Sequence, residues 1–193
     1  LKNLKTFWFY SGIKLSQSTG IDWNLSTTQE DSIVIAERIA KPFESCRLSA
    51  YWDVAGFPTN GWGNLLSRIT RQSLISKGMS EIEVDRWLHE TYPDITQDEA
   101  DAKFLINIAK AKAAVMRLVK VKLGKNQIAA LTDFTFNLGA GNLQSSTLLR
   151  CINRCDFIEA LDEFMKWNKA GGKVHRGLTR RRLAEKQIFK LDV

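Results

Sequence analysis

The chain has 193 residues, of which 44% are hydrophobic and 25% charged, which is an ordinary globular composition. An aromatic content of 10% argues against intrinsic disorder, and no apolar run approaches the roughly 18 residues that a membrane-spanning helix needs. Residues 1–100 carry 10 Lys and Arg against 13 Asp and Glu, whereas residues 101–193 carry 18 against 8. This basic half is a candidate for attraction to a polyanion, such as nucleic acid, a bacterial envelope or a phosphate-rich surface, but charge alone favours a merely solvated cationic face.

Residues 1–26 have mixed polarity and no clear period, and we interpret them as an extension before a domain that covers residues 27–193. The opening stretch LKNLKTFWFYSGIKL is too short and too polar for the apolar core of a secretory signal. Because the first residue is Leu, an upstream start or a removed export signal stays open.

The stretch TTQE at 27–30 predicts a capping box, with Thr27 as N-cap and Glu30 at the third helical position. Apolar residues then continue one helical face until Pro42 interrupts it, at positions 33, 35, 36, 39 and 40. Glu44 is therefore expected in the last turn of this helix or just after it.

From Leu48 to Trp62 the pattern favours strands, because aromatic and β-branched residues alternate with Gly and Pro. It predicts a short antiparallel hairpin or a three-stranded sheet. After that point the chain is expected to be helical. The first predicted helix covers 64–77, and the second is SEIEVDRWLHE, which begins with a capping box at Ser80 and Glu83. A long connecting helix follows, opened by the capping box TQDE at 96–99 and continuing to 123. The remaining predicted helices cover 125–138, 145–154, 156–168 and, after the loop AGGKVHRG, 178–190.

Cys46, Cys151 and Cys155 are an odd number, which does not indicate a disulfide framework. The last two lie four residues apart, but His89 and His175 are the only histidines that could complete a zinc site. We therefore expect no bound metal.

Two carboxylates and a hydroxyl frame the predicted hairpin: Glu44 lies nine residues before Asp53, and Thr59 follows six residues later. Glycosidic hydrolysis needs one protonated carboxyl group for the leaving oxygen and one ionised carboxylate near the anomeric carbon. The helix end could keep Glu44 protonated, while Thr59 could hold a water beside Asp53. Spacing alone is weak evidence, since most surface acids are simply solvated.

These residues, within ESCRLSAYWD and TNGWGN, resemble the Glu-eight-Asp-five-Thr signature of the phage-type lysozymes, the endolysins of glycoside hydrolase family 24. Further matching blocks follow in the same order as in the family: QIAALTDFTFNLGAGNLQSSTLL at 127–149, WNKAGG at 167–172 and GLTRRRLAE at 177–185. The resemblance covers roughly residues 30–190 in all. It implies a mainly helical α+β fold with two lobes, a small sheet in the first lobe and a long connecting helix.

The same resemblance implies a lysozyme-type glycosidase that cleaves the β-1,4 bond between N-acetylmuramic acid and N-acetylglucosamine in peptidoglycan and lyses bacterial cells. It assigns Glu44 as general acid, with Asp53 and Thr59 positioning water or stabilising the oxocarbenium ion. Whether the reaction retains or inverts configuration stays open, and no cofactor or metal is implied.

Substrate contacts carry over to Leu65, Phe136 and Ser146. For each of them an ordinary structural role is an equal alternative: the first two as core residues and Ser146 as a helix N-cap. The triple Arg180, Arg181 and Arg182 is interpreted as a solvated basic face of the last helix.

The chain departs from the family pattern at Ser45, Asn60 and Asn64, where the family usually has Gly, Ile and His. The segment of about residues 66–94 is interpreted as an inserted helical piece, with Ile82, Trp87 and Leu88 packing on the first lobe. It is expected to be a structural insertion, with a lid or a docking site as alternatives.

The expected partners are peptidoglycan glycan strands and the anionic envelope, for a monomer that does not bind nucleic acid. The expected location is synthesis in the bacterial host cytoplasm and action on peptidoglycan in the periplasm or cell wall. A phage enzyme, a prophage copy and a secreted antibacterial effector are all compatible with these residues.

Overall fold

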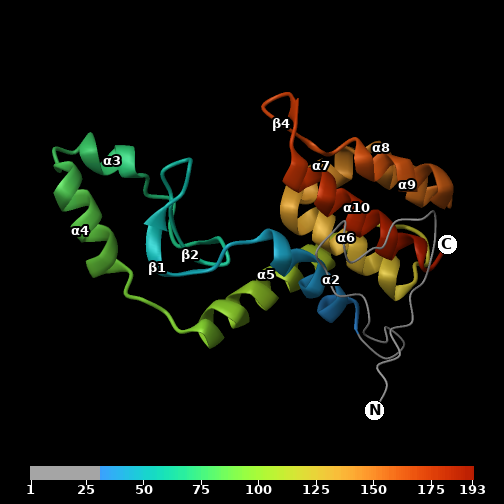
Figure 1. Cartoon of the computed structure of the whole chain (residues 1–193), viewed down its shortest axis with the longest axis horizontal. Helices are drawn as coiled ribbons and strands as arrows, with labels where there is room; N and C mark the ends of the chain where they lie inside the picture. The colour runs from blue at the N-terminus through green and yellow to red at the C-terminus, as the bar shows by residue number, and fades with distance from the viewer. Residues whose placement is uncertain (1–30) are drawn as a thin grey trace, which may run out of the picture. The chain divides into compact units, whose positions relative to one another are not determined.

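The computed structural model describes residues 31–193, which form two compact units. Unit 2 comprises Glu44–Asn107, and the described part of unit 1 comprises residues 31–43 and 108–193. The fold is α+β and mainly helical, and helix α5 (Gln97–Leu118) begins in unit 2 and ends in unit 1 (Figure 1). This confirms the predicted fold class. The extension 1–26 and the predicted capping box at 27–30 lie outside the described residues.

Unit 2 contains an antiparallel sheet in the order β1–β2–β3, formed by β1 (Arg47–Trp52), β2 (Pro58–Gly61) and β3 (Asn64–Leu65). The register of the first pair shifts between Arg47 and Tyr51, which marks a bulge or similar irregularity in β1. The three-stranded alternative from the sequence is therefore confirmed.

The predicted helix over 64–77 is too long, because its first two residues pair with β2 as β3. Only Arg71–Ile75 are helical there (α3), starting at Thr70, whose side chain accepts a hydrogen bond from the backbone N–H of Ser73. Strand pairing thus overrides the helical pattern at the beginning of this segment.

Helix α4 (Glu81–Thr91) starts at the predicted capping box of Ser80 and Glu83. Its buried residues are Val84 and Leu88, whereas Ile82 is 74% exposed, so the predicted packing of Ile82 is wrong. Trp87 does pack on the sheet of unit 2, the predicted first lobe, since its ring stacks on that of Trp52 with 6.2 Å between centroids.

The sheet of unit 2 is fixed to the first part of α5. The indole N–H of Trp62 donates to Asp101 Oδ1 at 2.6 Å, and its ring contacts Phe104. At Gly61, which has a positive φ of 56°, a Cβ would lie 3.3 Å from the Cβ of Ala100. Glycine therefore permits this close approach of β2 to α5.

Helix α5 has the predicted start and an earlier end than predicted. At its start the Thr96 N–H donates to Glu99 Oε2 and the Glu99 N–H donates to Thr96 Oγ1, which confirms the capping box at 96–99. It ends at Leu118 rather than 123, where Asn153 accepts from the Lys120 N–H and donates to the Leu118 carbonyl. A side chain distant in sequence therefore terminates the helix.

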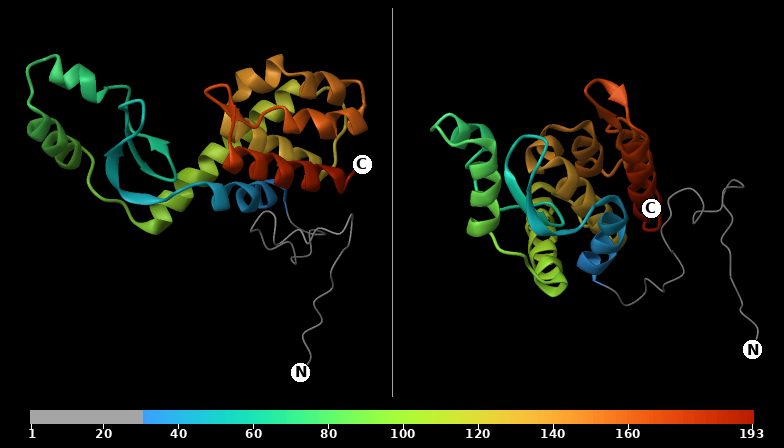
Figure 2. Two further views of the ribbon diagram at one scale, coloured as in Figure 1. Left: turned by 45° about the horizontal axis from the view of Figure 1, so that its top comes forward. Right: turned by 60° about the vertical axis from the view of Figure 1, so that its left-hand side comes forward.

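Unit 1 is a helical bundle in which α10 packs along α6 and α9, α2 packs on α6, and α8 lies beside α9 (Figure 2). The phenylalanine rings of Phe134, Phe164 and Phe189 form the centre of its core. Its elements are α2 (Ser32–Ala40), the 3-10 helix η1 (Lys41–Phe43), α6 (Lys125–Leu138), α7 (Ala140–Ser145), α8 (Thr147–Asn153), α9 (Phe157–Met165), β4 (Lys169–Ala170), β5 (Lys173–Val174) and α10 (Arg176–Lys190).

These bounds confirm the predicted helix 125–138 and the presence of helices near 145–154, 156–168 and 178–190. They correct the sequence interpretation at two places. Helix α7 was not predicted, and the segment interpreted as the loop AGGKVHRG includes part of a hairpin, in which β4 pairs with β5.

The N-terminus of α6 is capped by a residue near the other end of the chain. Asp192 accepts hydrogen bonds from the backbone N–H groups of Asn126 at 2.8 Å and Gln127 at 3.3 Å. A Cβ on the N-cap residue Gly124 would lie 2.2 Å from Asp192 Oδ2. The absence of a side chain at this position therefore admits the capping carboxylate.

Helix α8 ends in a Schellman motif. The Cys155 N–H donates to the Ile152 carbonyl, and the Asp156 N–H donates to the Cys151 carbonyl, both at 2.9 Å. Cys155 has a φ of 61°, in the left-handed region where glycine is the usual residue.

Candidate active site

Glu44 follows the helical entry to unit 2, as the sequence predicted. Helix α2 ends at Ala40, the turn η1 continues to Phe43, and Glu44 comes next, three residues before β1. Its side chain is half-buried. Pro42 lies within η1 rather than in the α-helix, since its ring is incompatible with a continuing helix.

Asp53 comes directly after β1 and builds the connection to β2. Its Oδ1 accepts hydrogen bonds from the backbone N–H groups of Ala55 at 2.8 Å and Phe57 at 2.9 Å. Its own N–H donates to the Phe57 carbonyl at 2.9 Å. Within residues 31–193, Oδ2 makes no hydrogen bond, and the side chain is half-buried. One carboxylate oxygen is thus fixed while the other stays available.

Thr59 lies on the central strand β2 and is only 4% exposed. Its Oγ1 donates to the Phe57 carbonyl at 3.2 Å, which leaves the oxygen lone pairs of the hydroxyl to accept. Both Asp53 and Thr59 are therefore hydrogen-bonded to the same residue, Phe57. The two polar side chains are held by one short turn.

Leu65 is directly opposite Thr59 in the register of β2 and β3. Cross-strand partners project on the same face of a sheet, so Leu65 shares the face of Thr59. Its side chain is 47% exposed, so the alternative of an ordinary core residue is wrong. An exposed leucine beside a buried threonine offers an apolar surface next to the candidate polar groups.

Phe136 and Ser146 belong to unit 1 and not to the unit that carries the other candidates. Phe136 lies on α6, half-buried, with the Arg181 guanidinium 5.8 Å from its ring centroid. Ser146 is the N-cap of α8: its Oγ accepts from the Leu149 N–H at 3.0 Å and donates to the Leu143 carbonyl at 2.7 Å. The N-cap alternative for Ser146 is therefore confirmed, and its contact with substrate stays a prediction.

Chemically, the turn offers an oriented carboxylate with one open oxygen beside a threonine hydroxyl. Such a pair can hold a water molecule or lie against developing positive charge. An equally local structural role is visible, because Asp side chains commonly stabilise turns by accepting from the backbone two residues on. Substitution at Asp53 can separate the two roles.

The sequence interpretation of the basic face on the last helix is wrong at two positions. Arg181 is 3% exposed and Arg182 is fully buried, whereas Arg180 is exposed. Arg181 donates to both carboxylate oxygens of Asp133, at 3.0 and 2.7 Å, and Arg182 donates to Glu185 at 2.6 Å. No signal along the sequence marks these partners, because Asp133 lies 48 residues from Arg181.

Burial dominates the electrostatics of this buried cluster. It raises the pKa of Glu185 well above the usual range, although the neighbouring Arg182 acts in the opposite direction. A buried ion pair is weak evidence of stabilisation, but loss of one partner leaves an uncompensated charge. We therefore regard the cluster as structural support for α6 and α10.

The three cysteines are all free thiols. Cys151 is buried, and burial raises the pKa of its thiol. Cys46 Sγ lies 3.8 Å from the side chain of Gln97.

Among residues 31–193, no group of three or more His, Cys, Asp or Glu side chains is placed to hold a metal ion. None of the helices described there is long and apolar enough to cross a bilayer.

Comparison with known proteins matches residues 41–185 to the family model described as phage lysozyme. An endolysin of an Acyrthosiphon pisum secondary endosymbiont phage is 33% identical over 156 residues, which cover 79% of this chain and 92% of that protein. The endolysin of Bacillus phage B103 is 40% identical over 95 residues, which cover 49% of this chain and 36% of that protein. Four of the matched curated relatives are covered over 36–59% of their own length.

The fold comparison agrees with these matches. The structure resembles the muramidase domain of SpmX from Asticaccaulis excentricus, with a TM-score of 0.61 and 25% sequence identity. The alignment covers 82% of this chain and 93% of that domain.

Proposed function

We propose, because this chain belongs to the phage lysozyme family, that it is an endolysin that hydrolyses the glycan strands of bacterial peptidoglycan. The bond cleaved is the β-1,4 linkage between N-acetylmuramic acid and N-acetylglucosamine, in line with the muramidase domain that shares its fold. The observation that carries the proposal is the turn of residues 53–59. There one Asp53 carboxylate oxygen makes no hydrogen bond within residues 31–193, while the Thr59 hydroxyl is held by the carbonyl of Phe57.

Glu44 is the proposed general acid, which gives its proton to the leaving glycosidic oxygen. Its half-buried position directly after η1, at the entry to unit 2, supports this role. Without that proton the leaving sugar would depart as an alkoxide, which is a poor leaving group.

Asp53 is the proposed partner carboxylate. Its bound oxygen fixes the direction of the carboxylate, and its open oxygen accepts from the hydrolytic water or stabilises the oxocarbenium charge. Thr59 orients that water through the acceptor lone pairs of its hydroxyl. All steps use side chains of the chain and require no metal or organic cofactor.

Leu65 is the better supported of the three proposed saccharide contacts, because it is exposed on the face that carries Thr59. Phe136 offers the part of its ring that is not buried. Ser146 has its hydroxyl engaged at both the donor and one acceptor position, so its contribution would come through the remaining lone pair.

The net charge of unit 1 suits an enzyme that acts at an anionic envelope. The described part of unit 1 has 19 Lys and Arg against 9 Asp and Glu, a net charge of +10, whereas unit 2 has 6 against 10, a net charge of −4. A basic surface raises the local concentration of the protein near a polyanion. We propose synthesis in the host cytoplasm, action as a monomer on peptidoglycan in the periplasm or wall, and lysis of the cell as the result.

The deciding experiment is digestion of purified sacculi followed by borohydride reduction and mass spectrometry of the fragments. A muramidase leaves N-acetylmuramic acid at the new reducing end, which is then recovered as muramitol. Glu44→Gln is expected to abolish both this product and the lysis of outer-membrane-permeabilised cells, with an unchanged circular dichroism spectrum. Reduced glucosamine ends, or full activity of Glu44→Gln, would refute the assignment.

A further inference from the structure

Unit 1 contains a pocket of about 460 Å³ that none of the proposed catalytic residues lines. It lies between the end of α5 and the pair α7 and α8. The lining consists of two leucines, two side-chain amides and three basic residues. Within the described chain, no Asp or Glu is part of this lining. This combination of side chains indicates a site for an anion with a short carbon chain whose C–H groups can lie on the leucines.

One wall of the pocket is fixed by hydrogen bonds between a side chain and the backbone. Asn153 joins α8 to the end of α5, because its side chain accepts from the Lys120 N–H at 2.8 Å and donates to the Leu118 carbonyl at 3.2 Å. Leu118 and Leu149 supply the apolar surface. The pocket is therefore formed before any ligand arrives, which lowers the cost of binding.

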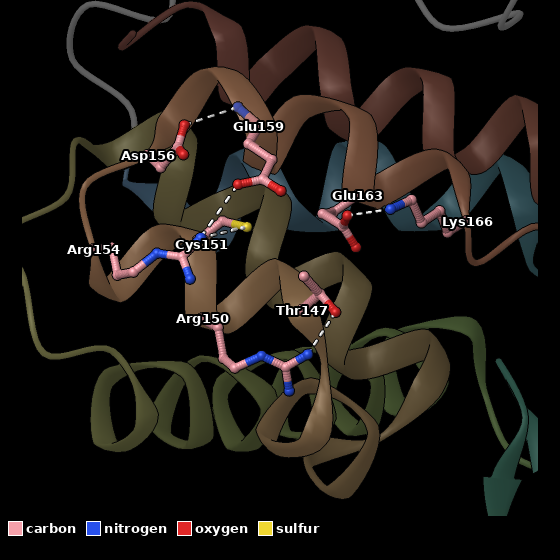
Figure 3. A network of polar contacts seen from close by, with 8 residues as sticks. All are labelled: Thr147, Arg150, Cys151, Arg154, Asp156, Glu159, Glu163 and Lys166. Atoms are coloured by element: carbon pink, nitrogen blue, oxygen red, sulfur yellow. Dashed lines mark hydrogen bonds and ion pairs between the residues drawn. The ribbon is translucent and has the colours of Figure 1, made fainter.

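Two of the three cations are held in place (Figure 3). Arg150 donates to Thr147 Oγ1 at 2.7 Å and to the Ser145 carbonyl at 3.3 Å, so neutral acceptors orient it, and no carboxylate within residues 31–193 pairs with it. Arg154 donates to Glu159 Oε2 at 3.2 Å, and this exposed pair leaves it partly neutralised. An arginine has five N–H donors, so both keep donors for a ligand.

The remaining polar groups of the lining are available. Lys120 Nζ has no ion-pair or hydrogen-bond partner within residues 31–193, and the same holds for the side-chain amide of Gln144. Lys120 and Arg150 therefore contribute two uncompensated positive charges. A guanidinium presents its donors in a fork that matches the oxygens of a phosphate, while an ammonium adds a point charge.

We propose that this pocket binds a glycerol phosphate group, with the phosphate at Lys120 and Arg150 and the glycerol carbons on Leu118 and Leu149. Two chemical sources display this group at a bacterial surface: the headgroup of an anionic phospholipid and a phosphate-linked polyglycerol wall polymer. Binding would hold the protein at the envelope. The proposal is independent of glycan hydrolysis, because it is tested by binding alone.

The test uses the full chain and compares two double variants that remove the same charge. Lys120→Gln/Arg150→Gln alters the pocket, and Lys169→Gln/Lys173→Gln removes two exposed charges from the β4–β5 hairpin of the same unit. The probes are soluble poly(glycerol phosphate) and phosphatidylcholine vesicles with and without phosphatidylglycerol. We expect the pocket variant to bind at least about tenfold more weakly, with the salt dependence reduced by about two charges, and the hairpin variant to keep most of its affinity.

Binding to one probe and not the other assigns the source of the group. Equal losses in the two double variants would overturn the proposal, because diffuse attraction to unit 1 would then explain the binding. It would also be overturned if the wild type bound neither probe, or if a peptidoglycan stem peptide, whose anionic groups are all carboxylates, competed as well as glycerol phosphate. Arg150→Lys keeps the charge without the fork, so intermediate binding is expected. Unchanged thermal unfolding of each variant excludes loss of fold as the cause.

Discussion

The structural and catalytic roles of Asp53 can be separated by two substitutions at the same position. Asp53→Asn keeps a carbonyl oxygen that can accept from Ala55 and Phe57 but removes the negative charge. Asp53→Ala removes both. We therefore expect both variants to lose catalysis, but only the alanine variant to weaken the turn of residues 53–57 appreciably.

The magnitude follows from the two hydrogen bonds, at 2.8 and 2.9 Å, to Oδ1. A hydrogen bond to a charged group contributes about 1.5–3 kcal/mol when buried. Ala55 is exposed, so water can replace the lost acceptor there, whereas Phe57 is half-buried and is compensated less well. The expected loss in the free energy of unfolding is about 1–3 kcal/mol for Asp53→Ala and about 1 kcal/mol or less for Asp53→Asn.

The assay combines two measurements on the same preparations. Urea unfolding gives the stability, and the rate of muropeptide release from purified sacculi gives the activity. Removal of a positioned acid–base group is expected to lower the rate by at least about a hundredfold in both variants. Thr59→Ser, which retains the hydroxyl, serves as the control for disturbance of the neighbouring strand.

Normal activity in Asp53→Asn would refute the reasoning, since the residue would then be required for the turn alone. Equal destabilisation by Asp53→Asn and Asp53→Ala would refute the proposed structural role of Asp53. The side-chain carbonyl retained in the asparagine variant would then not be accepting the hydrogen bonds from Ala55 and Phe57. Loss of activity with little loss of stability in Asp53→Asn is the result that supports the proposed role.

Three further predictions concern stability. Cys155→Gly should raise the free energy of unfolding by about 1 kcal/mol in urea, because it relieves a left-handed non-glycine residue, and Cys155→Ala should give no such gain. Asp192→Ala should lower it by about 1–2 kcal/mol, because α6 loses its cap, and Asp192→Asn should lose less. The hydrogen bond from Lys112 holds the pKa of Asp31 at about 2 in the folded protein, below its value in the unfolded chain. The contribution of the Asp31 carboxylate to the free energy of unfolding is therefore present above about pH 4 and is lost as the pH falls through the folded pKa. The stability gap between wild type and Asp31→Asn should therefore shrink on acidification, and a constant gap would contradict this.

The sequence predicted best those elements whose start is encoded by residues three positions apart. The boxes at Ser80 and Thr96 and the periodic segment 125–138 all appear as expected. The contacts that form the two boxes and the apolar period of 125–138 are local, so a pattern in a short window contains them, whereas the cap of that last helix comes from the distant Asp192.

Elements that depend on distant partners were not predictable in the same way. Asn64 and Leu65 are strand residues only because β2 offers its edge to them. The end of α5 is set by Asn153, and the burial of Arg181 is possible only because Asp133 lies on the packed face of α6. A run of basic residues looks solvated until the partners that compensate it are known.

For the candidate site, the sequence identified the residue types but not their geometry. That Leu65 shares the sheet face of Thr59 depends on the strand register, and a shift of one residue would have reversed it. That Ser146 uses its hydroxyl within the fold depends on the unpredicted helix α7, which supplies the Leu143 carbonyl.

The use made of each carboxylate oxygen distinguishes Asp53 from two fully engaged acids of unit 1, Asp133 and Asp192. Asp133 has both oxygens bound to Arg181, and Asp192 has both bound at the start of α6. An acid engaged in this way is fully committed to the folded state, because any new partner must displace an existing one. Among the residues that the structure describes, Asp53 is bound through Oδ1 alone, so it combines a defined direction with an open acceptor. Catalysis requires both properties, since a group must be oriented in advance and still free to bind the reacting water or charge.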